Sequence, residues 1–360
     1  MTFGNKDWWT FLGGWSWNPF GFAKPVLPAS QSDETPSVRP FTELHLEMTR
    51  RGSKPEYPYT FVALPESQQA GRPVLFDPAL QHIANGFRHG DPVLPDPATR
   101  VEWQKGRRSV TAGVLRSLVE SPELSDHLAL RGSLPLKCWC PDVAREPGDL
   151  DFVVVPSTIV MQSDAANALL ERLVKAISNA DVGGRARLMP ERMRSDLIWT
   201  YSRVPGRRFV VPWQVDELPV GTLQIDLVFE EAVPENAFRR DRPVLPDGSE
   251  VSCLVATPEM SLIWKLQWLL TDAHAQGKDL YDAVVLSRIA SLSVEELDRQ
   301  LRSVEPQWDR NPLSLGRIRE LRTEWKHFEA EYPWIGGTER EWLDRLIEGV
   351  RPAFERPAAS

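Results

Sequence analysis

Two aspartates that alternate with an apolar residue stand at the start of a run that strongly favours a strand. Asp149 and Asp151 lie on either side of Leu150, and the chain continues as Phe-Val-Val-Val to Val155. Because side chains two positions apart on a strand point to the same face, both carboxylates can bind one divalent cation. Carboxylate oxygens are ligands that Mg²⁺ takes in proteins. The sequence therefore predicts a metal site at the start of a central strand.

A Gly-Ser pair precedes these aspartates and suits a different ligand. Gly132 and Ser133 follow a short apolar strand predicted over Leu128–Leu130 and come before another apolar segment. Glycine lets the backbone approach a ligand closely, and the N-H groups at a helix start attract phosphate. We therefore expect a phosphate-binding turn beside the metal site.

A third aspartate and a lysine lie farther along the chain. Asp226 alternates with apolar residues between Gln224 and Phe229, so it is either a further metal ligand or a solvent-facing residue of an amphipathic strand. Three aspartates on neighbouring strands could bind two Mg²⁺ ions, one carrying a triphosphate and one activating a hydroxyl. Lys265 lies at the edge of the apolar stripe of a predicted helix, where it either reaches a phosphate or extends to solvent along its stem. Asp279 and Asp282 open a later helix, where acids also compensate the helix dipole.

The elements that would position these residues follow from periodicity. Val110 to Leu118 and a segment capped by Asp164 have helical spacing, and strands are predicted over 197–204, 209–215 and 222–229 in a mostly antiparallel sheet. From Pro258 onward helical patterns dominate, at 258–273, 278–291 and 293–303, with two more toward the C-terminus. We expect three parts: a Trp/Pro-rich N-terminal extension (1–100), an α/β core (101–255) and a helical C-terminal domain (256–360).

Composition is that of an ordinary globular protein. The chain has 360 residues, of which 42% are hydrophobic and 26% charged, and its formal net charge is -8. The three cysteines, Cys138, Cys140 and Cys253, lack zinc-binding spacing, so we interpret them as reduced and structural. With no signal peptide and no long apolar run, the protein is expected to be cytoplasmic, without a membrane partner. The aromatic residues of 1–22 are expected to dock on the protein or on a partner.

The order of these motifs resembles the AbiEii/AbiGii toxin family of nucleotidyltransferases, the enzyme half of bacterial type IV toxin-antitoxin systems, which includes the MenT toxins. The resemblance extends from about Val110 to Arg288. The matching segments are Leu130–Ser133, Arg145 to Phe152, Ile225–Asp226, Thr257–Glu259 leading to Lys265, and Lys278–Asp282. Two positions depart from the family: Pro147 stands where Ser or Thr is usual, and Thr271-Asp272 stand where an arginine often follows.

The resemblance implies a fold and a set of site residues. The fold is α/β, a polymerase-beta-like nucleotidyltransferase with a mixed sheet core and a helical C-terminal domain. Mg²⁺ (or Mn²⁺) would be held by Asp149, Asp151 and Asp226, with Lys265 and Asp282 as further catalytic residues. The nucleoside triphosphate would be bound by Gly132, Ser133, Arg145, Lys265, Lys278 and Asp279. Asp282 would orient Lys265 or the acceptor.

An arginine-rich segment bears on the acceptor. Between Asp181 and Val210 there are seven arginines against three acids, a local charge of +4. The arginines expected to grip RNA are Arg185, Arg187, Arg192, Arg194, Arg207 and Arg208. The alternative is that these arginines lie on a solvent-exposed face and form ion pairs with acidic residues of the protein. The resemblance implies transfer of a nucleoside monophosphate to the acceptor end of tRNA, with an antitoxin as a possible protein partner.

Two other functions fit the same residues. The acceptor could be a protein, such as the antitoxin, or a small hydroxylated molecule. Alternatively, the chain is a catalytically idle nucleotidyltransferase fold that serves as a binding module, which Pro147 would favour. Incubation with labelled triphosphates, RNA and protein distinguishes these alternatives.

Overall fold

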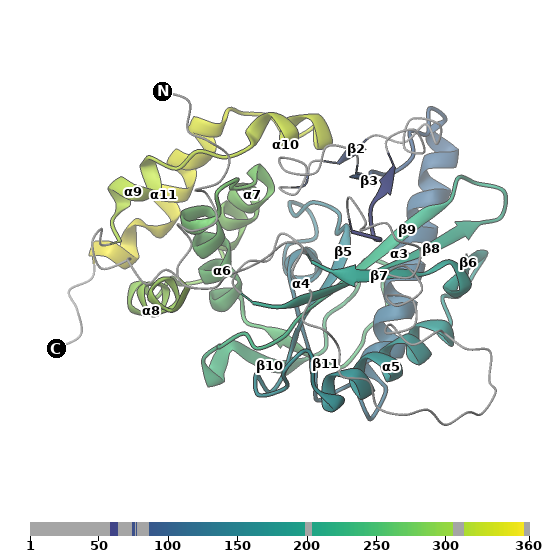
Figure 1. Cartoon of the computed structure of the whole chain (residues 1–360). Helices are drawn as coiled ribbons and strands as arrows, with labels where there is room; N and C mark the ends of the chain where they lie inside the picture. Colours follow the sequence, from purple (N-terminus) through teal and green to yellow (C-terminus); the bar gives the residue numbers. More distant parts are fainter. Residues whose placement is uncertain are drawn as a thin grey trace.

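The structure, a computed structural model, describes residues 58–63, 74, 75, 77, 86–198, 204–304 and 313–355. Among these residues, the largest sheet has eight strands in the order β10-β11-β4-β5-β9-β8-β6, with β7 paired to β8 (Figure 1). The strands are β4 (Leu128–Arg131), β5 (Asp149–Val154), β6 (Ala186–Leu188), β7 (Arg194–Leu197), β8 (Gly206–Val215), β9 (Gly221–Val228), β10 (Phe238–Asp241) and β11 (Cys253–Ala256). The α/β class with a mixed sheet is confirmed.

The antiparallel arrangement predicted in this region is found where β8 pairs with β7 and with β9. β5 pairs parallel with β9, and β11 pairs parallel with β4, so the whole sheet is mixed. β7 starts earlier than the strand predicted over 197–204, since it ends at Leu197 and pairs Arg194–Leu197 with Arg207–Val210 of β8. Residues 199–203 of that predicted strand lie outside the described residues. The strands predicted at 209–215 and 222–229 correspond to β8 and β9.

Two helices cover one face of the sheet. These are α3 (Pro97–Val119) and α5 (Asp164–Ser178). Alternate residues of β5 and β9, including Phe152 and Leu227, pack with them in one buried apolar cluster. Trp103 of α3 stacks on Trp213 with ring centroids 4.8 Å apart and donates its indole N-H to the carbonyl oxygen of Pro219 at 2.9 Å.

The N-terminal caps of these helices come from residues just before them. Asp96 caps α3, accepting from the backbone N-H of Thr99 at 2.7 Å, and Ser163 caps α5 in place of the predicted Asp164, which lies in the first turn. α3 also begins well before the predicted stripe at Val110, because Asp96 and Pro97 provide a good helix start.

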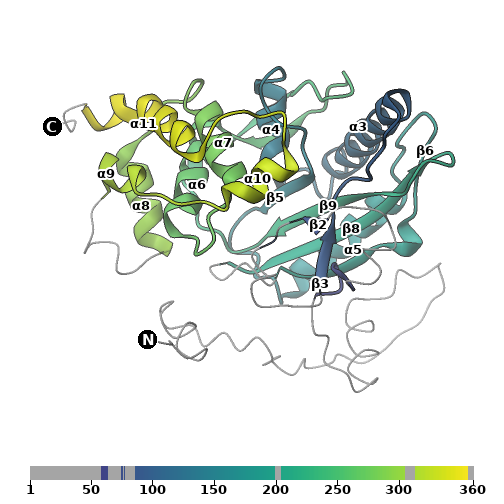
Figure 2. The ribbon, with the colours of Figure 1, turned by 90° about the horizontal axis from the view of Figure 1, so that it is seen from above.

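The opposite face of the sheet meets the C-terminal helices. The helices nearest the sheet are α4 (Ser133–Trp139), α6 (Pro258–Thr271) and α7 (Gly277–Leu286), and they are followed by α8 (Val294–Val304), α9 (Leu315–Arg319), α10 (Trp325–Glu331) and α11 (Glu339–Glu355). Figure 2 shows α6 to α11 gathered on one side of the molecule, with α3 and α5 on the other. Ala129 of β4 and Val153 of β5 join their apolar cluster. The helical part therefore packs on the strands that carry the aspartates.

The described part of the N-terminal extension forms a small sheet. Its strands are β1 (Val62–Ala63), β2 (Val74–Leu75) and β3 (Gly86–His89), in the order β1-β3-β2. The backbone N-H of Tyr59 donates to Asp196 at 2.8 Å, and the guanidinium of Arg208 lies 3.6 Å from Asp77. This extension therefore contacts the main sheet at β7 and β8. The expected docking of 1–22 lies outside the described residues.

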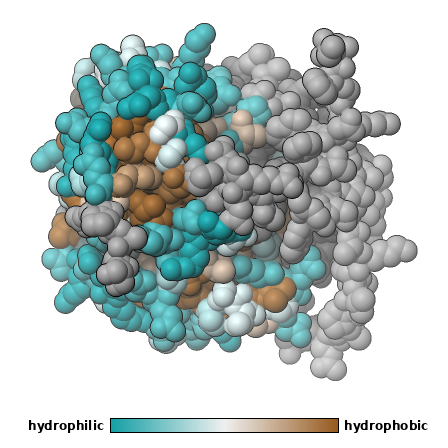
Figure 3. Space-filling model, turned by 90° about the vertical axis from the view of Figure 1, so that its left-hand side faces the viewer, coloured by the Kyte–Doolittle hydropathy of each residue, from teal (hydrophilic) through white to brown (hydrophobic). Residues whose placement is uncertain are grey.

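The surface on the helical side is mixed in character. Figure 3 shows an apolar area on this face, ringed by hydrophilic residues. Within the described ranges, no helix has the length and apolar character needed to cross a membrane. The three cysteines are unpaired, as expected.

Candidate active site

The three predicted aspartates meet on one face of the sheet. Asp151 of β5 is directly opposite Asp226 of β9 in the parallel register, and Asp149 is two positions before Asp151 on the same face. Leu150, Phe152 and Ile225 point to the other face and are fully buried. The alternation that the sequence shows thus separates an acidic face, toward the C-terminal helices, from the apolar core.

Two of these carboxyl groups have pKa values shifted in opposite directions, for different reasons. Burial, followed by the negative charges of Asp149 and Asp226, raises the pKa of Asp151 to about 8. Burial alone would raise the pKa of Asp149, but the positive charges of Lys278 and Arg145 outweigh it and hold that pKa below its usual value. Arg88 and Arg208 add to the lowering. The site is therefore a closely spaced acidic pair surrounded by cations.

The backbone at Gly132 lies against the carboxylate of Asp151. Its φ is +82° and its ψ is -146°, a conformation that side chains of other residues disfavour. A Cβ atom at Gly132 would lie 2.2 Å from Oδ2 of Asp151. Ser133 begins α4, and its hydroxyl donates to Oδ1 of Asp149 at 3.4 Å. The Gly-Ser turn therefore lies against both carboxylates, beside the predicted metal position.

Pro147, the position that departs from the family pattern, is held by α3. The guanidinium of Arg107 donates to the carbonyl oxygen of Pro147 at 2.7 Å, and Arg108 pairs with Glu146 at 2.7 Å. These contacts fix the chain just before β5. A proline at this position is therefore compatible with the placement of Asp149 and Asp151.

Lys265 and Asp282 belong to a buried charge network on α6 and α7. The ammonium of Lys265 lies 2.7 Å from Asp279 and 3.1 Å from Asp282. Arg145 donates from Nε and Nη2 to the two oxygens of Asp282, at 3.1 and 2.9 Å. Lys265 is only 6% exposed, so its side chain does not extend to solvent. Asp282 is fully buried, so it is not a solvated residue of a helix start. The network joins the loop before β5 to both helices.

The charges of this network influence the pKa values of the aspartates on the sheet. Burial would lower the pKa of Lys265, but Asp279 and Asp282 outweigh it and raise that pKa above its ordinary value. The ammonium in turn counteracts the rise in the pKa of Asp151. Lys278, partly exposed at the start of α7, is the strongest single charge that lowers the pKa of Asp149. The two lysines therefore flank the acidic pair.

Asp226 has partners that the sequence does not reveal. Arg208 of β8 donates from Nε and Nη2 to the two oxygens of Asp226, both at 2.8 Å, and the side-chain amide of Gln224 donates to Oδ2 at 3.0 Å. Within the part of the chain that the structure describes, no group of three Asp, Glu, His or Cys side chains has metal-binding geometry. Asp149 and Asp151 offer oxygen ligands that suit a hard divalent cation, whose charge would relieve their repulsion. The residues therefore fit such a cation.

The six arginines predicted to bind RNA separate into two groups. Four of them are exposed: Arg185 in the turn before β6, Arg187 on β6, Arg192 on the short helix η3 (Pro190–Arg192) and Arg194 on β7. Arg207 and Arg208 are only 3% and 6% exposed. The guanidinium of Arg207 donates to Ser195 at 2.9 Å, and Arg208 binds Asp226. The two β8 arginines are therefore internal and do not belong to an exposed basic face.

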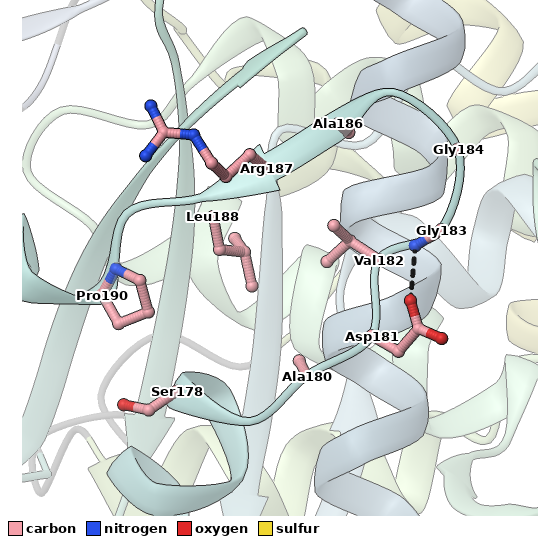
Figure 4. A pocket seen from close by; sticks show the side chains of 10 residues that line it. All are labelled: Ser178, Ala180, Asp181, Val182, Gly183, Gly184, Ala186, Arg187, Leu188 and Pro190. Carbon is pink, nitrogen blue, oxygen red and sulfur yellow. Dashed lines mark hydrogen bonds between the residues drawn. The ribbon is translucent and has the colours of Figure 1, made fainter.

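A pocket of about 590 Å³ lies apart from the aspartates, between the C-terminal end of α5 and β6. Figure 4 shows Val182 and Leu188 side by side in it, while the guanidinium of Arg187 points away from both. The backbone N-H of Gly183 donates to Asp181 at 2.9 Å. None of the predicted catalytic residues lines this open pocket, so we do not assign the chemistry to it.

Sequence reasoning missed four residues near the acids. Arg131 follows the apolar strand directly and was part of the matched motif; it pairs with Glu231 at 2.7 Å and stacks over the rings of Trp264 and Trp268. Gln224 stands two positions before Asp226 on the same strand, so alternation alone could have predicted that the two side chains lie on one face. Asp77 and Arg88 lie in the proline-rich extension and carry no signal in the sequence.

The fold and site define a nucleotidyltransferase, in which a sheet carries neighbouring aspartates beside a Gly-Ser turn. The family described as "Nucleotidyl transferase AbiEii toxin, Type IV TA system" matches residues 114–338, more than half of the chain. The chain belongs to this family. Among curated proteins, no sequence matches it.

Solved structures show a more distant likeness. The MenT4 nucleotidyltransferase toxin of Mycobacterium tuberculosis is 15% identical, with 71% of this chain and 86% of that chain covered and a TM-score of 0.46. JHP933 from Helicobacter pylori is 14% identical, with 72% and 92% covered and a TM-score of 0.39. The antibiotic-resistance factor ANT(2'')-Ia is 9% identical, with 57% and 94% covered and a TM-score of 0.33.

Proposed function

We propose that the chain transfers a nucleoside monophosphate from a nucleoside triphosphate to the 3′ hydroxyl of an RNA, with the acceptor end of tRNA as the target. The observation that carries this proposal is the meeting of Asp149, Asp151 and Asp226 on one face of the sheet, beside Gly132 and facing the helices that bear two lysines. Phosphoryl-type transfer depends mainly on positioning and charge, which such a site supplies.

Asp149 and Asp151 are the residues that would hold Mg²⁺ or Mn²⁺, with Asp226 as a further ligand. When bound, the cation would neutralise charge on the phosphates and favour the attacking hydroxyl. Gly132 lets the carboxylate of Asp151 lie against the backbone, in the space that a Cβ atom would need. Ser133 orients Asp149 through its hydroxyl.

The triphosphate would lie between the Gly-Ser turn and the start of α7. Lys278 is partly exposed and close enough to Asp149 to lower its pKa, so it suits direct phosphate contact. Arg145, Lys265 and Asp279 act from the buried network, and Asp282 orients Lys265 by pairing with its ammonium. These residues keep the site preorganised before the substrate arrives.

The exposed arginines of β6, η3, β7 and the turn before β6 supply a surface for the RNA backbone. Arg185, Arg187, Arg192 and Arg194 form this proposed RNA surface, and the internal Arg207 and Arg208 do not. Since the chain as a whole is acidic, such a local patch is required for RNA binding. An antitoxin protein is the expected partner of a toxin family, and we place the reaction in the cytoplasm, where tRNA and triphosphates occur.

The test is transfer of label from each of the four nucleoside triphosphates, in separate reactions with total tRNA and Mg²⁺. We expect label on tRNA with the parent chain and a loss of at least ~100-fold in Asp151→Asn, which removes a charged metal ligand. Asp344→Asn, at an exposed α11 residue, is the matched control and should keep parental activity.

Label confined to the protein would overturn the tRNA acceptor and favour protein modification. If a folded parent labels neither RNA nor protein with any triphosphate, the chain is an idle binding module or acts on a small molecule. Chelation of divalent cations should abolish labelling; activity that survives chelation contradicts metal dependence.

A further inference from the structure

Four charged residues form a row across four adjacent strands. Arg131 of β4 is opposite Asp151 of β5, Asp151 is opposite Asp226 of β9, and Asp226 is opposite Arg208 of β8. Directly opposed residues place their side chains on the same face of a sheet. The row therefore consists of two central carboxylates with a guanidinium at each end.

Arg208, at one end of the row, is hydrogen-bonded to both oxygens of Asp226. Its two 2.8 Å hydrogen bonds are bidentate, and with Gln224 they engage both oxygens of a carboxylate that is 2% exposed. A divalent cation shared by Asp151 and Asp226 would face this guanidinium at short range, and like charges repel strongly in a buried site. Asp226 can serve as a full ligand only if Arg208 has another carboxylate available.

Such a carboxylate lies next to Arg208 on the N-terminal extension. Oδ2 of Asp77 is 3.6 Å from Nη1 of Arg208, and Asp77 is 4% exposed. The same oxygen is 3.2 Å from Nη1 of Arg88 on β3. Asp77 and Arg88 lie outside residues 114–338, so the family match does not include them.

We propose that Arg208 is a positioning residue that neutralises Asp226 in the absence of metal, and that Asp77 receives its guanidinium when a divalent cation binds Asp151 and Asp226. Asp226 then exchanges one cationic partner, the guanidinium, for the divalent cation, and the guanidinium stays paired at Asp77. The inference rests on the proposed metal site. It gives the N-terminal extension a role in cation binding at the active site.

The experiment measures Mn²⁺ binding to the full chain without nucleotide, by electron paramagnetic resonance of free Mn²⁺. Arg208→Gln should bind Mn²⁺ about tenfold more tightly, because the competing charge is gone. Asp77→Asn should bind about tenfold more weakly, because the guanidinium then stays on Asp226. In an Asp226→Asn background, Arg208→Gln should lose its effect.

Arg207→Gln is the matched control, since Arg207 is the adjacent buried arginine on β8 and faces the other side of the sheet. It should leave Mn²⁺ affinity unchanged. If Arg208→Gln fails to fold, as judged by thermal unfolding, Asp77→Asn decides alone, because it leaves the Arg208–Asp226 pair intact.

Two failures are distinguishable by adding Asp151→Asn. Parental affinity in both Asp77→Asn and Arg208→Gln, with binding lost in Asp151→Asn, overturns the role of Arg208 and leaves the metal site standing. Binding that survives Asp151→Asn unchanged overturns the proposed metal site itself, and with it this inference.

Discussion

At the scale of single residues, Gly132 shows the tightest constraint in the site. Its positive φ and the 2.2 Å separation between a Cβ atom and Asp151 act independently, one through the backbone and one through contact. Either would disfavour a side chain. Together they mean that the carboxylate of Asp151 occupies the space that any other residue would need.

We predict that Gly132→Ala destabilises the fold by about 1–3 kcal/mol, through backbone strain, and also abolishes nucleotide transfer by displacing Asp151. Urea unfolding and the labelling assay measure the two effects. Gly183→Ala is the control, because Gly183 also has a positive φ (65°) but has no atom within 4 Å of a Cβ. It should lose stability and keep activity; parental activity in Gly132→Ala contradicts the prediction.

At the scale of elements, the Asp282 network joins three segments. Arg145 precedes β5, Lys265 belongs to α6 and Asp282 to α7, and all three are buried. Burial would raise the pKa of Asp282, but the charges of Arg145 and Lys265 outweigh it and hold that pKa below its ordinary value. A carboxyl whose pKa is lowered by folding stabilises the fold above its unfolded pKa, and that contribution disappears as pH falls through its folded pKa.

We predict that Asp282→Asn lowers the free energy of unfolding by about 3–5 kcal/mol at pH 7, because it leaves Arg145 without its bidentate partner. The difference from the parent should stay constant down to pH ~5 and narrow below pH ~4, where the parent's carboxyl begins to be protonated. Urea unfolding across this range measures it. A difference that does not change with pH would contradict the assigned role.

The sequence predicted those parts of the site that depend on local pattern. Alternation placed Asp149 and Asp151 on one face, and the helical pattern predicted over 293–303 corresponds to α8 (Val294–Val304), where the Ser293 hydroxyl accepts from the backbone N-H of Glu296 at 3.1 Å. The pairing of Asp226 with Arg208 depends on register between two strands, and periodicity within each strand does not encode register. For the same reason Arg208 was expected at the surface, although alternation in β8 turns it toward Asp226.

At the scale of the whole molecule, charge is distributed unevenly. The net charge is -8, yet Arg187 of β6 and Arg192 of η3 are both exposed. A contact between an arginine and a phosphate releases a counterion, so it contributes to the salt dependence of RNA binding.

We predict that Arg187→Gln with Arg192→Gln weakens tRNA binding and lowers the slope of log affinity against log salt by about 2, one for each lost phosphate contact. Fluorescence anisotropy with labelled tRNA between about 50 and 200 mM salt measures the slope. Arg299→Gln with Arg302→Gln, at exposed α8 residues paired within their helix, is the control. An equal decrease in both double variants would indicate general charge rather than a specific surface.

The helix α3 has a consequence for the design of shortened proteins. It runs from Pro97 to Val119, while the family match begins at 114, so the segment that matches the family starts inside a helix. Removing the first part of α3 would take away its cap at Asp96 and expose Trp213, which Trp103 covers. A truncated chain that keeps α3 whole and capped should therefore begin before Asp96.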